Sequence, residues 1–463
     1  MYINNFHHPK LHIQEFQTRN NQSWCIYGNN TSGIDTFLQL IERNLSDYNV
    51  DSLELPDCAG IISFARQQEL FEEELRNDDS DFLDRIDPGT LVRQFLPGYQ
   101  VHLPLLRSLD MEKCLDLGFC QLSSGQCRKL LILKELINGS KTLILQNPYD
   151  GLDEKSCSEL DQMLNSLQQR TIAIILLVNT KVDIPIWCSH LAVFDSGELL
   201  CSGERDKIVA DMLTQEEEKK ENSLLPPAPP TGRASDNREE SEELIFLSQG
   251  FAGYGDKKLF SGLDLSISTG DHTLICGHNG CGKSTLLDII TGDNPKCYAN
   301  NLRIFGRKRG SGESIWDLKK KMGIISPGLH RNHRAVGTGL HVVLSGLFDS
   351  IGLYQKVHTK DIQRAKLWLN WINLSTKETT PFRNLTFAEQ RLILIARALI
   401  KEPKLLILDE PTHGLDDDNR EKLLFFLDQV AEKQLSTILF VSHRRDEHRP
   451  FFQNHIQLDS YTP

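Results

Sequence analysis

The nine residues Gly277-His278-Asn279-Gly280-Cys281-Gly282-Lys283-Ser284-Thr285 read GHNGCGKST and match the phosphate-loop pattern G-x-x-x-x-G-K-[ST]. They follow a short β-like run, Leu274 to Cys276, as the pattern requires. Glycines here let backbone N–H groups wrap phosphate oxygens, and the helix that follows directs its positive end at them. We expect Lys283 to reach the terminal phosphates and Ser284 to place its hydroxyl on Mg²⁺. The other residues expected to line this ligand are Gly277, Asn279, Gly280, Cys281, Gly282 and Thr285.

A second stretch, Leu406-Ile407-Leu408-Asp409-Glu410-Pro411, ends a buried-strand pattern in two carboxylates. Asp409 is placed to hold the Mg²⁺ shell, and Glu410 is placed to orient or deprotonate an attacking water. Taken alone, the stretch would be read more simply as a buried strand that ends in a solvated acidic turn. Its position downstream of the glycine-rich loop favours the catalytic interpretation, and it argues against an accidental Gly-rich turn at 277–282.

The pattern of the second half is repeated in the first half. GNNTSG at 28–33 corresponds to GHNGCG at 277–282, and each follows a β-like run. LSSGQ begins at Leu122 and LTFAE begins at Leu385, and each start lies 24 positions before the matching residue, Gln146 or Asp409. A fixed order with matching spacing indicates a tandem repeat. Strands that alternate with helical segments predict an α/β fold with a mainly parallel core sheet in each half.

A linker is predicted between the two halves. Residues 216–221 read EEEKKE and residues 226–230 read PPAPP. Such a composition does not bury enough apolar surface to offset its ordering entropy, and the prolines favour a semi-rigid extended spacer. We therefore predict one domain at 1–212, an acidic Pro-rich linker at 213–243 and a second domain at 244–463.

Composition excludes several classes of protein. The formal net charge is −12, so broad electrostatic attraction to nucleic acid or anionic lipid is not expected. The 11 cysteines form no CxxC pair and no Cys/His cluster with zinc spacing, which favours reduced thiols. The chain begins without an apolar signal core, and runs such as Ile172 to Val178 are far short of the roughly 20 residues that span a bilayer. We expect a cytoplasmic chain with no membrane channel of its own; a peripheral position on the cytoplasmic face of the inner membrane is the alternative.

These motifs resemble the ATP-binding cassette (ABC) family over nearly the whole chain. LSSGQ is similar to the family's signature sequence, and Val441-Ser442-His443 is similar to its switch histidine, which contacts the γ-phosphate. Tyr254 lies 29 residues before Lys283, where family members stack an aromatic ring on adenine; a packing role is the alternative. The resemblance implies ATP and Mg²⁺ as ligands. It also implies that each half has an antiparallel β part and a helical subdomain beside its core sheet.

In this family two cassettes pair head to tail, and each nucleotide lies between the phosphate loop of one half and the signature of the other. The resemblance therefore implies that Ser123, Gly125 and Gln126 of the first half complete the ATP site of the second. It further implies the catalytic residues Glu410, Lys283 and His443 and the metal ligands Ser284 and Asp409.

The departures from the family pattern fall on one of the two composite sites. In the first half, Ile34 and Asp35 replace the Lys and Ser of the loop. The two carboxylates are replaced by Gln146 and Asn147, and Asn179 stands where the switch histidine belongs. The second half's signature, LTFAE at 385–389, has lost both glycines. We predict one ATP-hydrolysing composite site with slow turnover and one degenerate site; the degenerate site either binds nucleotide without hydrolysis or is a structural relic.

One departure touches the competent half. Family members carry Gln after the strand that follows the phosphate loop, where it helps to hold Mg²⁺ and communicates with a membrane partner. The segment Gly323-Ile324-Ile325-Ser326-Pro327-Gly328 contains no Gln, whereas Gln67 or Gln68 is placed to fill this role in the first half. Weaker metal binding and altered coupling to a permease are therefore expected.

Three functions stay open at this point. Residues 301–307, 310–317 and 345–354 resemble a double-cassette member of the family that is associated with molybdate-transport genes, which favours a transport-associated ATPase with a separate membrane permease. An ATP-switched regulatory protein comes second, because closure of the two halves would itself be the output. A ribosome-acting factor comes third, because such proteins usually have two intact sites and a long basic linker. The basic runs at 307–309 and 319–321 are read first as solvated surface and second as a nucleic-acid or ribosomal contact.

Overall fold

The structure is a computed structural model that describes residues 1–19, 22–63, 66–67, 70, 73–74, 88–219, 242–254, 257–332, 337–444 and 447–462. Two compact units make up the chain. The first takes in Met1–Ser223 with Asp416–Asp418, and the second takes in Leu224–Leu415 and Asn419–Pro463.

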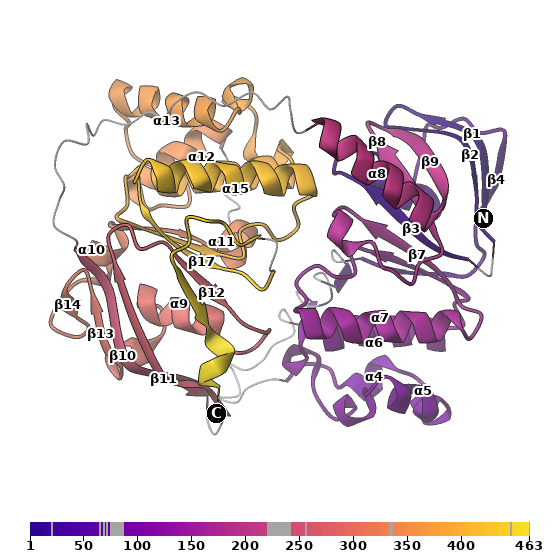
Figure 1. The fold of residues 1–463 in the computed structure, drawn as a ribbon, viewed down its shortest axis with the longest axis horizontal. Coiled ribbons are helices and arrows are strands. Elements are labelled where there is room, and N and C mark those ends of the chain that lie inside the picture. The colour runs from indigo at the N-terminus through magenta and orange to yellow at the C-terminus, as the bar shows by residue number, and fades with distance from the viewer. Residues whose placement is uncertain are drawn as a thin grey trace. The chain divides into compact units, whose positions relative to one another are not determined.

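The first unit is built on a nine-stranded sheet in the order β4-β1-β2-β9-β8-β3-β7-β6-β5. Its core strands β8, β3, β7, β6 and β5 pair in parallel, and β9 joins them to the antiparallel strands β2, β1 and β4. The strands are β1 (Tyr2–His8), β2 (Leu11–Gln17), β3 (Ser23–Gly28), β4 (Ser52–Glu54), β5 (Ala59–Ile62), β6 (Thr142–Gln146), β7 (Ala173–Val178), β8 (His190–Asp195) and β9 (Glu198–Glu204). The helices are α1 (Ile34–Ile41), α4 (Val92–Phe95), α5 (Leu103–Ser108), α6 (Ser124–Ile137), α7 (Glu154–Gln168) and α8 (Arg205–Lys219). Helices α6 and α7 lie side by side and contact β5 and β7 respectively (Figure 1).

The second unit carries the same parallel order in a sheet of its own, β15-β16-β17-β12-β18, and a separate antiparallel sheet, β11-β10-β13-β14. The strands are β10 (Glu243–Tyr254), β11 (Lys257–Ser268), β12 (Thr273–Cys276), β13 (Asn301–Ile304), β14 (Arg307–Lys308), β15 (Met322–Ile325), β16 (Leu405–Asp409), β17 (Thr437–Val441) and β18 (Asn454–Gln457). The helices are α9 (Lys283–Thr291), α10 (Ile315–Lys319), α11 (Pro327–Asn332), α12 (Gly339–Ser345), α13 (Thr359–Trp371), α14 (Phe387–Leu399) and α15 (Asp417–Glu432).

Short 3-10 helices complete both units. In the first they are η1 (Tyr99–His102), η2 (Glu112–Cys114), η3 (Phe119–Gln121) and η4 (Lys181–Asp183). In the second they are η6 (Pro295–Tyr298), η7 (Gly346–Phe348), η8 (Ser375–Lys377), η9 (Phe382–Asn384) and η11 (Leu458–Tyr461).

Burial on both faces explains why the central strands are continuous apolar runs. All five residues of β16 and all five of β17 are buried, as expected for parallel strands with both faces covered. In the second unit's helical part, the Trp368 and Trp371 rings of α13 have centroids 5.2 Å apart, and Trp371 lies 4.6 Å from the Phe426 ring of α15. Aromatic packing of this kind ties the helical subdomain to the rest of the unit. The predicted fold class, an α/β repeat with parallel core, antiparallel part and helical subdomain, is confirmed.

The boundary region differs in detail from the prediction. Helix α8 continues to Lys219, so the predicted linker at 213–243 begins inside a helix and ends on the first residue of β10. Leu, Gln, Glu and Lys in residues 213–219 are good helix formers, which accounts for the continuation. Residues 220–241 lie outside the described part of the chain.

Candidate functional site

The phosphate loop of the second unit connects the end of β12 to the start of α9. Gly280 has φ +82° and Gly282, the residue before α9, has φ +103°. A Cβ on Gly282 would also meet side-chain atoms of Leu259 and Phe260 at 3.1 Å. Only glycine adopts these backbone angles without strain, so the loop's shape depends on the glycines of the sequence pattern.

Lys283 is buried at the first position of α9. Its Nζ donates to the carbonyl oxygens of Gly277, at 2.7 Å, and His278, at 3.1 Å. The ammonium is therefore held inside the curve of the loop, beside the helix N-terminus where anions bind favourably.

Ser284 and Asp409 meet as the sequence predicts for a metal pair. The Ser284 hydroxyl donates to Asp409 Oδ2 at 3.1 Å, although the two residues are 125 positions apart. Burial, and secondly the charge of Glu410, raise the pKa of Asp409 to about 6, against the lowering effect of the Ser284 hydrogen bond. A hydroxyl and a carboxylate are donors that Mg²⁺ accepts, so these residues fit the ion.

Glu410 and His443 form a second pair in the same unit. His443 Nδ1 lies 3.1 Å from Glu410 Oε1. Burial alone would raise the pKa of Glu410, but the hydrogen bond and charge of His443, with the charges of His413 and Lys283, lower it to about 2. Glu410 is thus an anion whose basicity is suppressed by its histidine. Its backbone has φ +45°, and its N–H donates to Val441 O at 3.1 Å.

The corresponding loop of the first unit keeps the left-handed glycine before its helix but has lost the chemistry. Gly33 precedes α1 with φ +90°, as Gly282 precedes α9. Ile34, at the position of Lys283, is 8% exposed and packs in the core with α1. Asp35 Oδ1 accepts a hydrogen bond from Gln146 Nε2 at 2.9 Å. In this unit the carboxylate lies on the helix and the donor ends the strand, whereas in the second unit the donor Ser284 lies on the helix and the carboxylate of Asp409 ends the strand.

The electrostatics of this first-unit pair also differ. Burial raises the pKa of Asp35, while the Gln146 hydrogen bond lowers it. Asn147, which corresponds to Glu410, has the same positive φ, +44°, and its N–H donates to Leu177 O at 2.7 Å. An amide at 146 and another at 147 offer no carboxylate base.

The two signature segments begin helices with the same cap. Ser123 is the N-cap of α6: its Oγ accepts from Gln126 N at 3.2 Å, and Gln126 Oε1 accepts from Ser123 N at 2.9 Å. Thr386 caps α14 in the same reciprocal way with Glu389. Gly125 lies in the first turn of α6 with ordinary backbone angles. The signature residues at 385–389 differ from the family pattern, yet the start of helix α14 is capped as the start of α6 is.

Two predicted positions can be placed only in part. Tyr254 is the last residue of β10, and its side chain lies outside what the structure describes, as does all of Gln68. Gln67 is described, and its Oε1 accepts from Arg128 Nη2 at 3.0 Å and Nε at 3.3 Å.

Sequence reasoning missed a pair of buried arginines. Arg128 is 2% exposed, and its Nη1 also donates to backbone oxygens at Asn147, Pro148 and Asp150, so it ties Gln67 to the loop after β6. Arg391, 1% exposed, lies at the same offset after its signature, and its Nε and Nη1 find no hydrogen-bond partner among the described residues. The shared offset of six positions from Leu122 and Leu385 was the available signal.

Comparison with known proteins identifies the family of the chain. Residues 260–413 match the family model described as ABC transporter, and the chain belongs to the family of ABC transporter ATP-binding proteins. It is 34% identical to the ABC transporter ATP-binding protein ModF of Escherichia coli (strain K12) over 446 residues, which cover 94% of this chain and 91% of ModF. It is 31% identical over 198 residues to the molybdate import ATP-binding protein MolC of Haemophilus influenzae (43% of this chain and 72% of MolC).

Solved structures with two cassettes share the fold. A model of ribosome-bound archaeal Pelota and ABCE1 aligns with a TM-score of 0.61 at 16% identity, covering 99% of this chain and 75% of that chain. The RNase-L inhibitor aligns with a TM-score of 0.57 at 15% identity, covering 96% and 84%. Among the described residues, no helix is both long and apolar enough to cross a membrane.

Proposed function

We propose that this chain binds Mg²⁺ and ATP at one composite site and hydrolyses ATP there slowly. The observation that carries the proposal is the contrast between the units. Ser284–Asp409 and Glu410–His443 are assembled in the second unit, whereas Asp35–Gln146 occupies the corresponding place in the first. Only the second set offers both metal ligands and a carboxylate base.

Each side chain of this site has a definite task. Lys283 leaves the carbonyl oxygens of its own loop for the β- and γ-phosphates, and Ser284 and Asp409 would hold the metal ion, which would supply positive charge beside the phosphates. His443 turns from Glu410 to the γ-phosphate. Since its hydrogen bond and charge lower the pKa of Glu410, this turn raises the basicity of the carboxylate when the attacking water is in place.

We place the second half of the site on the first unit. The start of α6, with Ser123, Gly125 and Gln126, directs backbone N–H groups of a helix N-terminus at the γ-phosphate. Head-to-tail pairing of the cassettes then makes ATP the ligand that joins them, and loss of the γ-phosphate lets them separate. The other composite site, made of the first unit's loop and LTFAE, is inactive.

The matched caps of α6 and α14 allow a direct test of this arrangement. Ser123→Ala and Thr386→Ala each remove the same kind of helix cap, at a cost of about 1 kcal/mol each. Only Ser123 belongs to the proposed active site, so Ser123→Ala lowers kcat for ATP at least tenfold while Thr386→Ala leaves it within about twofold. Equal losses in the two variants, with equal shifts in thermal unfolding, would reject the composite site.

We propose a transport-associated role with a separate membrane partner. The support is the similarity to ModF along nearly the whole chain, together with MolC, whose name specifies molybdate import. The ribosome-bound and RNase-L inhibitor structures are similar at 15–16% identity, which supports the common fold alone.

Partner capture in the native cell tests this role. Glu410→Gln keeps the side-chain shape, slows hydrolysis and holds the protein in its ATP-bound state. Lys283→Ala is the matched control, because without the lysine the protein does not reach the ATP-bound state. Recovery of a membrane permease with Glu410→Gln and ATP, and not with Lys283→Ala, supports the transport role. Recovery of ribosomes would replace the transport role with that of a translation factor. Recovery of neither partner would replace it with that of a soluble switch.

A further inference from the structure

The end of the chain returns to the phosphate loop through the sheet of the second unit. Strand β18 pairs in parallel with β12, with Gln457 opposite Cys276. The residues after these two strands therefore leave the sheet at the same edge. Asp459, in η11, comes to lie beside His278, although 181 positions separate them.

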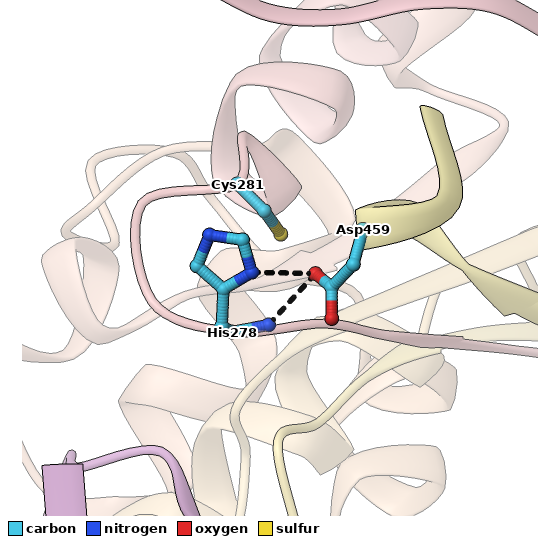
Figure 2. Close-up of side chains that lie close together, drawn as sticks. All are labelled: His278, Cys281 and Asp459. Atoms are coloured by element: carbon cyan, nitrogen blue, oxygen red, sulfur yellow. Dashed lines mark hydrogen bonds and ion pairs between the residues drawn. The ribbon is translucent and has the colours of Figure 1, made fainter. Parts of the chain in front are cut away.

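Three different metal-ligating groups converge there (Figure 2). Asp459 Oδ1 accepts from the backbone N–H of His278 at 2.9 Å and lies 2.9 Å from His278 Nδ1. Cys281, on the same loop as His278, brings its Sγ to the same place. The nitrogen, sulfur and oxygen ligand atoms all lie within 4.8 Å of one another. In the part of the chain that the structure describes, no other three His, Cys, Asp or Glu residues meet in this way.

We propose that His278, Cys281 and Asp459 form a binding site for a thiophilic divalent cation of the Zn²⁺ class. Imidazole nitrogen, thiolate sulfur and carboxylate oxygen are the donors that Zn²⁺ takes, with water in the fourth tetrahedral position. Zn–ligand bonds of roughly 2.0–2.3 Å place tetrahedral ligands about 3.5 Å apart. His278 Nδ1 and Asp459 Oδ1, now 2.9 Å apart, must therefore separate slightly to hold the ion, and the limit of 4.8 Å on all three ligand atoms leaves only a small adjustment for Cys281.

The surroundings suit a bound cation. The side chains of His278 and Asp459 are 48% and 34% exposed, which gives an ion a way in, whereas Cys281 is 1% exposed and forms the floor. Gln457 Nε2 donates to Asp459 Oδ2 at 3.0 Å, so the second oxygen of the carboxylate is oriented by a neighbour. Partners of this kind fix a metal ligand's orientation.

Binding requires a simple exchange of protons. The Cys281 thiol loses its proton to solvent when the S–Zn bond forms. His278 binds through Nδ1 and carries its proton on Nε2, so the Nδ1–Asp459 hydrogen bond is replaced by two bonds to the ion. No residue is shared with the Ser284–Asp409 pair, so this site is separate from that for Mg²⁺.

Cobalt titration of the full-length, nucleotide-free protein tests the site, because Co²⁺ bound to a thiolate gives a charge-transfer absorption that oxygen ligands do not. We expect one equivalent of Co²⁺ to produce this band and Zn²⁺ to abolish it. Cys281→Ser and Asp459→Asn remove the band. Cys201→Ser, at an exposed cysteine, and Asp409→Asn, in the Mg²⁺ pair, leave it unchanged.

Several results would overturn the proposal. They are no thiolate band in the unmodified protein, a band that survives Cys281→Ser, or a band lost in Asp409→Asn but retained in Asp459→Asn. Thermal unfolding shows whether each variant is folded. If Cys281→Ser does not fold, Asp459→Asn, which preserves the side-chain shape, provides the test.

Discussion

Replacing Asp409 by Asn should stabilise the nucleotide-free protein while removing its Mg²⁺-dependent ATP binding. Burial and the neighbouring Glu410 raise the pKa of Asp409 from 3.8 to about 6. At about 1.4 kcal/mol per pKa unit, the ionised carboxylate destabilises the fold by up to about 3 kcal/mol. Asn has no charge, and its amide oxygen still accepts from Ser284.

The effect has a definite pH dependence. A carboxyl group whose pKa is raised on folding is protonated in both states below pH 3.8, so it costs nothing there, and its cost grows as pH rises towards 6. The stability gained by Asp409→Asn should therefore rise from roughly 1.5 kcal/mol at pH 5 to roughly 3 kcal/mol at pH 8.

Guanidinium unfolding of the unmodified protein and the variant at these two pH values measures the difference. Asp57→Asn, at an exposed aspartate, is the control, and its stability should stay within about 0.5 kcal/mol at both. The reasoning fails if Asp409→Asn is less stable at pH 8, or if its advantage does not change with pH.

Three other perturbations have expected outcomes. Lys283→Ala should lower phosphate release from ATP by at least about 100-fold, because no second site compensates; turnover equal to the unmodified protein contradicts the single site. His443→Ala removes the hydrogen bond that lowers the pKa of Glu410 in the free protein, so the acid limb of the pH profile of kcat/KM, which reports the free enzyme, should move to higher pH; an unmoved limb would show that Glu410 is not the base. Gly282→Ala should destabilise the protein by about 1–3 kcal/mol in thermal unfolding, since its φ is +103°. Gly328→Ala, where φ is not positive, should be neutral or stabilising by up to about 1 kcal/mol.

Much of the fold was predictable because the repeat fixes the order of its elements. Equal spacing from each signature predicted that Gln146 and Asp409 end corresponding core strands, and β6 and β16 occupy equivalent places in their sheets. What the spacing did not predict is the sheet organisation. In the first unit β9 joins the antiparallel strands to the core, whereas the second unit keeps two sheets. Whether two sheets join depends on edge pairing between distant strands, which leaves no local pattern.

Short motifs predicted which side chains lie together, as with Ser284 and Asp409 or Glu410 and His443. Arg128 and Arg391 were missed because arginine is ordinarily a surface residue, and their burial is set by tertiary packing. The cluster at His278 was missed for a different reason. Spacing along the chain detects neither Asp459 nor any ligand brought back by a parallel strand, so the absence of a zinc pattern in the sequence did not exclude a zinc site.

The left-handed backbone that Glu410 and Asn147 share affects the stability of the two units differently. Both residues have φ near +45°, a conformation that Asn tolerates well and Glu tolerates poorly. The first unit also has neutral amides where the second has two adjacent acids, so at these two positions it avoids both the strain and the repulsion. At these two positions the second unit is thus the more strained of the two, and the first unit is the more relaxed. Under the proposed function, replacing these residues of the second unit to gain heat resistance would remove its carboxylate base, whereas the first unit carries the more stable residues already.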